Sequence, residues 1–367
     1  MKLKHILFVL ACVSVVHLAR GQGQARKYSN EFMRIGVGAA AFGMGNAQTA
    51  TATDVTAAYW NPAGLSTQQA IAYPEVALMH AAYFANIGTY NYIGLALPVD
   101  SSGNRRFGVS LIRLGVDDIP NTLKLIEDDG SINYDAIQSF SSTDFAAILS
   151  YAWQPRQVKG LSLGTNVKII YRGVGRFANA WGFGIDLAAR YQANGLQLGL
   201  VLADATNTFN AWTFNTETFE DDFINTGNAV PLDTIEITRP SLRLGLAYEF
   251  SLAKRLSLTC ALDIDAYFDG NRAGALWSQG GVSIDPHAGL EFAYHNSQRR
   301  PVAFFRAGFY NLQQLSNREG EQVYGLFPTA GVGLVIKNFQ LDYALANIGN
   351  LSENLHSHVV SLKFHIQ

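Results

Sequence analysis

Closely spaced acids and histidines are the residues of this sequence best suited to chemistry. Asp263 and Asp265 stand two residues apart, and so do His356 and His358, so each pair shares one face of an extended strand. Such a pair could bind a cation, but we interpret both as polar positions on a hydrated wall. The sequence has no H-x-x-x-H and no C-x-x-C pattern, the common spacings of metal ligands. We therefore expect no metal, no cofactor and no enzyme activity.

A larger group of charged residues lies at alternating positions of segments that resemble strands. Both signs are present, and the candidates for a polar inner wall are Lys168, Arg172, Asp186, Arg190, Arg243, Glu249, Asp263 and Asp265. An open pore would leave such charges unpaired in water, whereas a filled lumen favours pairing between them. We favour a paired, hydrated wall that seats a plug over a selectivity filter.

A third group is aromatic and lies within residues 206–239. Its members stand among acidic residues and are Phe209, Trp212, Phe214, Phe219 and Phe223. So many large rings in one connection exceed what solvation requires. Two interpretations remain open: a lid over the mouth of a barrel, or a docking site for a protein partner or an apolar ligand.

The elements that must position these groups are amphipathic strands. Within residues 161–172, Leu163 and Val167 share one face while Asn166 and Lys168 share the other, which is the two-residue period of a strand with one apolar face. About fourteen such segments lie near 70–84, 90–99, 106–116, 142–153, 160–173, 180–192, 196–205, 240–251, 255–268, 284–296, 301–312, 325–337, 339–348 and 356–366. An even number of strands about ten residues long is typical of bacterial outer-membrane barrels.

The connections between these segments support the same architecture. Residues 117–141 and 206–239 are the long connections, and both face outward if the two termini are periplasmic. Short periplasmic turns and long extracellular loops are typical of outer-membrane barrels. We therefore predict an all-β membrane protein: a roughly 14-stranded antiparallel barrel with both termini in the periplasm.

Residues 36–65 differ from the strands because they are rich in Gly and Ala. Small side chains let one backbone approach another closely. In the run Tyr59-Trp60-Asn61-Pro62-Ala63-Gly64-Leu65, proline disfavours a helical conformation at Asn61, and Gly64 permits a tight reversal. A compact segment of small residues ahead of a run of strands predicts a plug inside the barrel.

The pattern of residues 36–65 resembles the N-terminal hatch of the FadL-like outer-membrane barrels, and is most similar to the PorV/PorQ branch of Bacteroidetes-type bacteria. Residues 204–212, DATNTFNAW, resemble a segment of the same branch. The hatch positions on which we place the motif are Gly43, Gly45, Asp54, Asn61, Pro62 and Gly64. The resemblance implies a hatch within the lumen, preceded by a periplasmic lead-in at residues 22–32.

Residues 1–21 have the features of a secretory signal peptide: a basic start, an apolar core and small residues before the cleavage point. Its removal takes away three basic residues, so 27 − 3 = 24 basic residues face 29 acidic ones and the mature charge is −5. That balance gives no support to nucleic-acid binding. We predict a signal peptide at 1–21, a lead-in and hatch at 22–69, and a barrel at 70–367.

Two functions follow from the resemblance. The PorV/PorQ branch implies a scaffold or shuttle in type IX protein secretion, with secretion-complex or other outer-membrane proteins as partners. The wider FadL-like group implies a transporter that passes hydrophobic small molecules through a shifted hatch and an opening in the wall. The scaffold is our main hypothesis and the transporter is the alternative. Both place the chain in the outer membrane of a Gram-negative bacterium, in contact with lipid and lipopolysaccharide.

Overall fold

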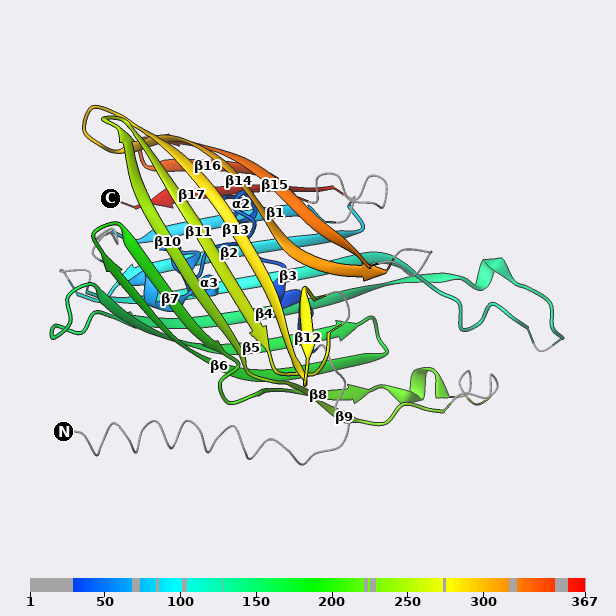
Figure 1. Cartoon of the computed structure of the whole chain (residues 1–367). Coiled ribbons are helices and arrows are strands. Elements are labelled where there is room, and N and C mark those ends of the chain that lie inside the picture. The colour runs from blue at the N-terminus through cyan, green and yellow to red at the C-terminus, as the bar shows by residue number, and fades with distance from the viewer. Residues whose placement is uncertain are drawn as a thin grey trace, which may run out of the picture.

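Alternation of apolar and polar side chains produces strands through most of the chain, and Figure 1 shows them arranged in a ring. The computed structural model describes residues 29–67, 73–83, 86–100, 104–127, 129–220, 224, 229–272, 275–316, 322–346 and 356–366. The predicted signal peptide, residues 22–28 of the predicted lead-in, and Phe223 lie outside these residues.

All strands join one antiparallel sheet. In chain order they are β1 (Glu75–Tyr83), β2 (Gly88–Pro98), β3 (Arg105–Asn121), β4 (Gln138–Trp153), β5 (Leu161–Val174), β6 (Ala178–Ala193), β7 (Leu196–Ala203), β8 (Thr208–Phe214), β9 (Thr234–Thr238), β10 (Ser241–Ala253), β11 (Leu256–Tyr267), β12 (Trp277–Gln279), β13 (Val282–His295), β14 (Pro301–Ser316), β15 (Gln322–Ile336), β16 (Phe339–Ala346) and β17 (Ser357–His365). Because β1 pairs with both β2 and β17, the sheet closes on itself.

The closed ring confirms the predicted 14-stranded barrel. β6 pairs with both β7 and β8, so these two are parts of one interrupted strand, and β9 and β10 pair with them in the same way. Counting each interrupted strand once and leaving out the short β12 gives 17 − 3 = 14 strands. The range 206–239, predicted as a loop, therefore includes the wall strands β8 and β9.

The two faces of the wall differ as the sequence pattern predicts. On β5, Asn166 and Lys168 are buried toward the lumen, whereas Val167 between them is 43% exposed on the outer face. On β6, Trp181 and Phe183 project outward in the same way. Apolar outward-facing side chains suit contact with lipid. None of the helices in the described part of the chain is long and apolar enough to span a membrane.

Residues 29–67, here called the inner segment, lie within the ring of strands (Figure 1). They form the short helices η1 (Glu31–Arg34), α2 (Ala39–Gly43), α3 (Ala57–Trp60) and η2 (Pro62–Leu65). α2 packs on β14–β17, while η2 packs on β3–β6 across the lumen. Asn30 donates a hydrogen bond to Thr238 on β9, so the described end of the predicted periplasmic lead-in instead lies inside the ring, on the side of the long connections.

Glycines on the wall set how closely the inner segment packs. A Cβ atom built on Gly199 of β7 would overlap the backbone of Thr49, and one on Gly289 of β13 would overlap the backbone of Met44. The inner segment contributes a matching glycine, Gly45 (φ +60°), which lies against the backbone of Phe309. Backbone therefore meets backbone at each of these contacts, because one of the two partners is a glycine.

Two polar contacts hold the inner segment at its position along the axis of the barrel. Lys363 on β17 donates a 2.5 Å hydrogen bond to Asp54, and Asp263 on β11 accepts a 2.7 Å hydrogen bond from the backbone N–H of Thr49. Burial alone would raise the pKa of Asp54, but the Lys363 ammonium and hydrogen bonds from Thr56 hold it below its ordinary value of 3.8. Asp54 is therefore charged at neutral pH and forms an ion pair with the last strand.

The closed sheet predicts the behaviour of an outer-membrane barrel during purification. The folded protein should give circular dichroism dominated by β-structure and should change its mobility on gels after boiling. A spectrum with substantial helix would contradict the architecture, because only short helices occur among the described residues.

Gly289→Ala should displace the inner segment, since the added methyl group would overlap the backbone of Met44. Overpacking of this kind costs about 1–3 kcal/mol. Urea unfolding of the two proteins in detergent measures the difference. Gly88→Ala is the matched control, because the nearest atom to its added Cβ is 3.7 Å away. If Gly289→Ala and Gly88→Ala lower the free energy of unfolding equally, the close contact between Gly289 and Met44 is contradicted.

Asp54→Asn should lower the free energy of unfolding by about 3 kcal/mol at pH 7, because it leaves the Lys363 ammonium buried without a charged partner. The folded-state pKa of Asp54 is lowered, so the pair stabilises the protein above the ordinary carboxyl pKa and loses its effect as the pH falls through the lowered value. The difference between wild type and variant should shrink accordingly in acid. Glu249→Gln is the control, because Glu249 is exposed. Its free energy of unfolding should equal that of the wild type both at pH 7 and in acid.

Candidate functional site

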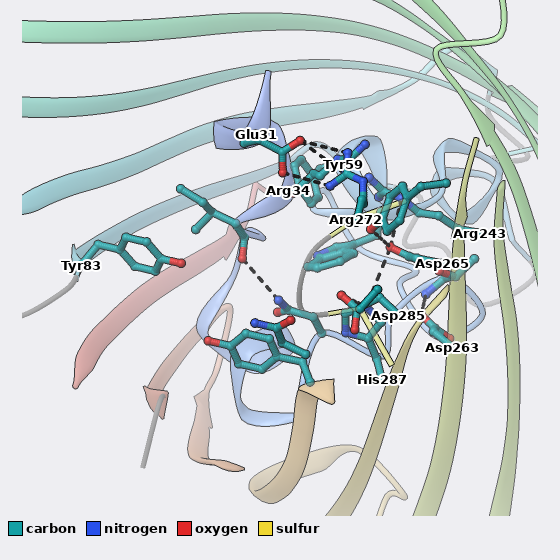
Figure 2. A pocket seen from close by; sticks show the side chains of 18 residues that line it. Glu31, Arg34, Tyr59, Tyr83, Arg243, Asp263, Asp265, Arg272, Asp285 and His287 are labelled. Carbon is teal, nitrogen blue, oxygen red and sulfur yellow. Dashed lines mark hydrogen bonds and ion pairs between the residues drawn. The ribbon is translucent and has the colours of Figure 1, made fainter. Parts of the chain in front are cut away.

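A cavity of about 510 Å³ lies at the long-connection end of the lumen, and we call it the vestibule (Figure 2). Its floor is the inner segment, including Asn46, Thr49 and Trp60. Its sides come from β10, β11, β13 and β14, and its rim includes the β11–β12 connection. The vestibule is therefore bounded by the wall on its sides and by the inner segment below.

One side of the vestibule carries three carboxylates and an imidazole. The Nε2 atom of His287 lies 3.8 Å from a carboxylate oxygen of Asp265 and 3.8 Å from one of Asp285. Its Nδ1 lies 3.2 Å from the carbonyl oxygen of Gly45 and, because a carbonyl only accepts, must carry the proton of that hydrogen bond. Asp263 completes the group, here called the acidic side (Asp263, Asp265, Asp285 and His287).

The opposite side of the vestibule carries arginines that are already paired. The guanidinium groups of Arg34 and Arg272 lie 4.0 and 4.4 Å from the ring centroid of Tyr267. Both arginines also form ion pairs with Glu31 and Asp269. Figure 2 shows Glu31, Arg34 and Arg272 grouped together, away from Asp263 and His287. Positive charge on this side is therefore neutralised locally.

Tyr59 and Trp60 of α3 form the deepest aromatic part of the vestibule. Their rings meet edge to face at 4.8 Å between centroids. The Tyr59 hydroxyl donates to the Met33 carbonyl and accepts from the Gly36 N–H, while the Trp60 N–H donates to the Val37 carbonyl. Burial raises the pKa of Tyr59 to about 12, so its hydroxyl stays neutral and holds the start of the inner segment against α3.

The wall is interrupted between β7 and β8. Leu187 of β6 pairs with Leu202, but Phe183 pairs with Phe209, so four steps along β6 oppose seven steps along the neighbouring strand. Three extra residues therefore bulge from the ladder. Asp204 begins this bulge with a left-handed backbone (φ +54°), a conformation that Asp adopts more readily than most residues. Only local support makes such an interruption stable within a wall.

A buried cluster supplies that support. Lys168 lies 2.7 Å from a carboxylate oxygen of Asp186 and 2.5 Å from one of Asp204. Asp186 also accepts a hydrogen bond from the backbone N–H of Asp204. Asn166 links the cluster to the inner segment, since its amide donates both to Asp186 and to the carbonyl of Ala58. The interruption, its charges and the inner segment thus form one connected network.

A second, small cavity of about 30 Å³ lies behind the interruption. Its lining includes apolar side chains of Met33, Ile148 and Val201, together with Lys168 and Asp204. Arg34, Tyr59 and Arg243 line both this cavity and the vestibule. A single layer of side chains therefore separates the vestibule from the space beside the interrupted strand.

The remaining wall candidates have separate surroundings. Arg190 donates to the carbonyl of Ala50 and to Gln192 and Gln197, so it holds the inner segment. Arg172 pairs with Asp144 and Glu236 near the long connections. Arg243 lies 3.8 Å from Asp265 in the vestibule. Glu249 is exposed near the short-turn end of β10 and joins none of these groups.

The predicted hatch positions all lie within the inner segment. Asn61 has extended backbone (φ −158°), its side chain accepts from the Ala63 N–H, and Pro62 begins η2. This is the turn that the Asn-Pro pair predicts. Gly43 packs against Gly331 of β15, and a Cβ on Gly64 would overlap the carbonyl of Ala52. With Gly45 and Asp54 already described, the six positions serve packing and anchoring.

The aromatic residues of 206–239 do not form one surface. Phe209 is 48% exposed on the outer face of β8, whereas Phe219 is 3% exposed and packs on Phe177. The Trp212 indole donates to Glu236 and lies 5.2 Å from the Arg172 guanidinium. Phe214 stacks on Trp212. The structure therefore separates the predicted lid or docking group into inner-wall, outer-wall and buried positions.

Sequence reasoning missed several of these groups. Glu31 and Arg34 lie in the short helix η1, Arg272 lies in the β11–β12 connection, and no motif marks them. Nor does any motif mark Asp285 and His287 in the first half of β13. It also missed a G-x-S-x-G pattern at residues 160–164. In hydrolases that serine stands on a strand-to-helix turn, but Ser162 is buried within β5 and donates to the carbonyl of Ser66. It anchors the end of the inner segment.

Among the described residues, no group of three or more acids, histidines and cysteines is arranged to hold a metal ion. The acidic side of the vestibule is included in that finding. Its carboxylates must therefore be considered as hydrogen-bonding and charged groups.

No protein-family model and no curated protein matches the chain. Solved structures do. The Pseudomonas putida toluene transporter TodX aligns with a TM-score of 0.55 at 15% identity, over 94% of this chain and 99% of TodX. A protein described as the CymD monoaromatic hydrocarbon channel aligns with a TM-score of 0.55 at 14% identity, over 91% and 98% of the two chains. A Pseudomonas aeruginosa FadL homologue is more distant, with a TM-score of 0.48 at 13% identity, over 93% and 99%.

At such identities the likeness concerns the fold. It extends over nearly the whole of TodX and CymD. No comparison distinguishes the PorV/PorQ branch. The chain has the β-barrel fold of TodX and CymD.

Proposed function

We propose that this protein transports small hydrophobic molecules across the outer membrane. The observation that carries the proposal is the adjacency of the vestibule, the small cavity and the interrupted strand, with Arg34, Tyr59 and Arg243 lining both cavities. Its fold is that of TodX, described as a toluene transporter, and of CymD, described as a monoaromatic hydrocarbon channel. The alternative hypothesis from the sequence is thus preferred over the scaffold.

The route runs through the wall because the lumen below the vestibule is filled. The inner segment meets wall glycines backbone to backbone, as at Gly199 and Gly289. A molecule entering from the long-connection end reaches this floor and turns toward the interruption. Movement of residues 30–34 together with the Arg243 side chain would join the two cavities. The molecule then leaves between strands, into the apolar interior of the membrane.

An apolar molecule gains from this route. Its transfer from water to a hydrocarbon interior is favourable by about 25 cal/mol for each Å² of apolar surface. An exit through the side of the barrel delivers it to that interior without passage through a second aqueous compartment. The inner segment and wall then need only a small, local opening.

A scaffold role in type IX secretion rests on the resemblance of residues 36–65 and 204–212. The aromatic loop no longer favours it, because Trp212 is engaged by Glu236 and Arg172 on the inner wall. Within our proposal, residues 1–21 direct secretion, the inner segment acts as the hatch, and the end of β17 belongs to the periplasmic side.

Deleting Ala205, Thr206 and Asn207 should abolish transport, because it removes the three extra residues and restores a continuous ladder beside β6. Uptake of radiolabelled toluene by cells or vesicles that contain the variant should fall at least tenfold, to the level of membranes without the protein. Folding is monitored by the shift in gel mobility on boiling.

Deletion of Asp129, Gly130 and Ser131 is the control, since it shortens the β3–β4 connection by the same number of residues away from the interruption. It should leave uptake unchanged. Normal uptake by a folded variant lacking 205–207 would refute the lateral route, and absence of uptake by the wild-type protein would refute the transport proposal.

A further inference from the structure

Negative charge in the vestibule is concentrated on the acidic side. Arg34 and Arg272 are balanced by Glu31 and Asp269. On the acidic side, Asp265 pairs with Arg243, whereas Asp263 and Asp285 form no ion pair with an arginine among the described residues. With a neutral imidazole the balance there is +1 − 3 = −2, and with a protonated imidazole it is −1. The acidic side therefore attracts cations.

Two buried atoms of the acidic side, Oδ1 of Asp263 and Nε2 of His287, have no hydrogen-bond partner in the protein. The Nε atom of the neighbouring Arg243, which is a donor, is also unpartnered. Asp263 is 2% exposed and His287 is 8% exposed, and both line the vestibule. Since Nδ1 of His287 carries the proton shared with Gly45, Nε2 of the neutral ring is an acceptor. Both unpartnered acceptors therefore require a donor from within the cavity.

The spacing of the group leaves room for that donor. His287 Nε2 lies 3.8 Å from Asp265 and 3.8 Å from Asp285, too far for direct hydrogen bonds. The volume of about 510 Å³ lies in the range of small-molecule sites. The rings of Tyr59, Trp60 and Tyr310 line the same cavity. Aromatic faces favour both an organic cation and an apolar body attached to it.

We propose that the vestibule is a binding site for small organic amines. Their ammonium group donates hydrogen bonds to Asp263 and His287 and is neutralised by Asp265 and Asp285, while their apolar part lies against the aromatic rings. An ammonium group offers three donors and a positive charge, which matches the unpartnered acceptors and the excess of carboxylates. The vestibule is also the entrance of the proposed route, but binding of an amine there does not require transport of hydrocarbons.

The test uses the full mature protein in detergent micelles and three probes of similar size, measured by isothermal titration calorimetry at pH 7. They are 2-phenylethylamine, the neutral 2-phenylethanol and the anion 3-phenylpropanoate. The amine should bind at least tenfold more tightly than the alcohol, and the anion should bind most weakly. Equal binding of amine and alcohol, or preferred binding of the anion, would overturn the proposal.

Asp285→Asn should weaken binding of the amine at least tenfold and leave that of the alcohol unchanged. Asp285 lies on β13 and forms its ion pair with the nearby His287, so the fold should persist. Asp144→Asn, which removes a wall carboxylate that pairs with Arg172 outside the vestibule, is the matched control. Equal losses in the two variants would refute a specific site.

Asp263→Asn is the second variant if the first fails to fold, because its amide oxygen still accepts the Thr49 N–H. It too should weaken amine binding at least tenfold, and unchanged binding would overturn the proposal. Toluene uptake and amine binding by the wild-type protein separate the two hypotheses. Absent uptake with tight amine binding counts against transport alone, whereas normal uptake with no preference for the amine counts against the amine site alone.

Discussion

Contact between backbone and backbone, across the glycines of the inner wall, is the constraint on which the rest of this structure depends. Gly199 and Gly289 on the wall and Gly45 on the inner segment leave no space for a side chain. The inner segment therefore packs closely against the wall, and polar groups such as Asp263 and Lys363 can reach it as anchors. The vestibule exists above this contact because the inner segment fills the space below it.

Much of the fold follows from local pattern. The two-residue period places strands correctly because one face must meet lipid and the other the lumen, and the Asn-Pro pair predicts the turn at Asn61. The interruption at 204–207 escaped prediction, since residues 208–214 have too few alternating positions to stand out from a loop. For the same reason Trp212 was assigned to a loop surface, whereas pairing with β6 and β9 turns it toward Glu236.

The site was less predictable because it is assembled from distant parts. Lys168, Asp186 and Asp263 could be assigned to the inner face by alternation alone, but the partners of Lys168 include Asp204, which lies in the bulge. His287 contacts Gly45, which is 242 residues away in the chain. No spacing in the sequence encodes such a contact, because it depends on strand register and on the path of the inner segment. Charge balance within a cavity is likewise a property of the closed ring.

The pairing of Asp54 with Lys363 also has a meaning for assembly. These residues are 309 positions apart, and Lys363 lies on β17, the strand that closes the ring against β1. The inner segment is synthesised first, yet its contacts extend to the final strand, and a closed wall offers no wide entrance for a chain of this size. The sheet must therefore curl around the segment as it forms. In that process the strands close around the inner segment, and the ion pair between Asp54 and Lys363 forms only when the last strand is in place.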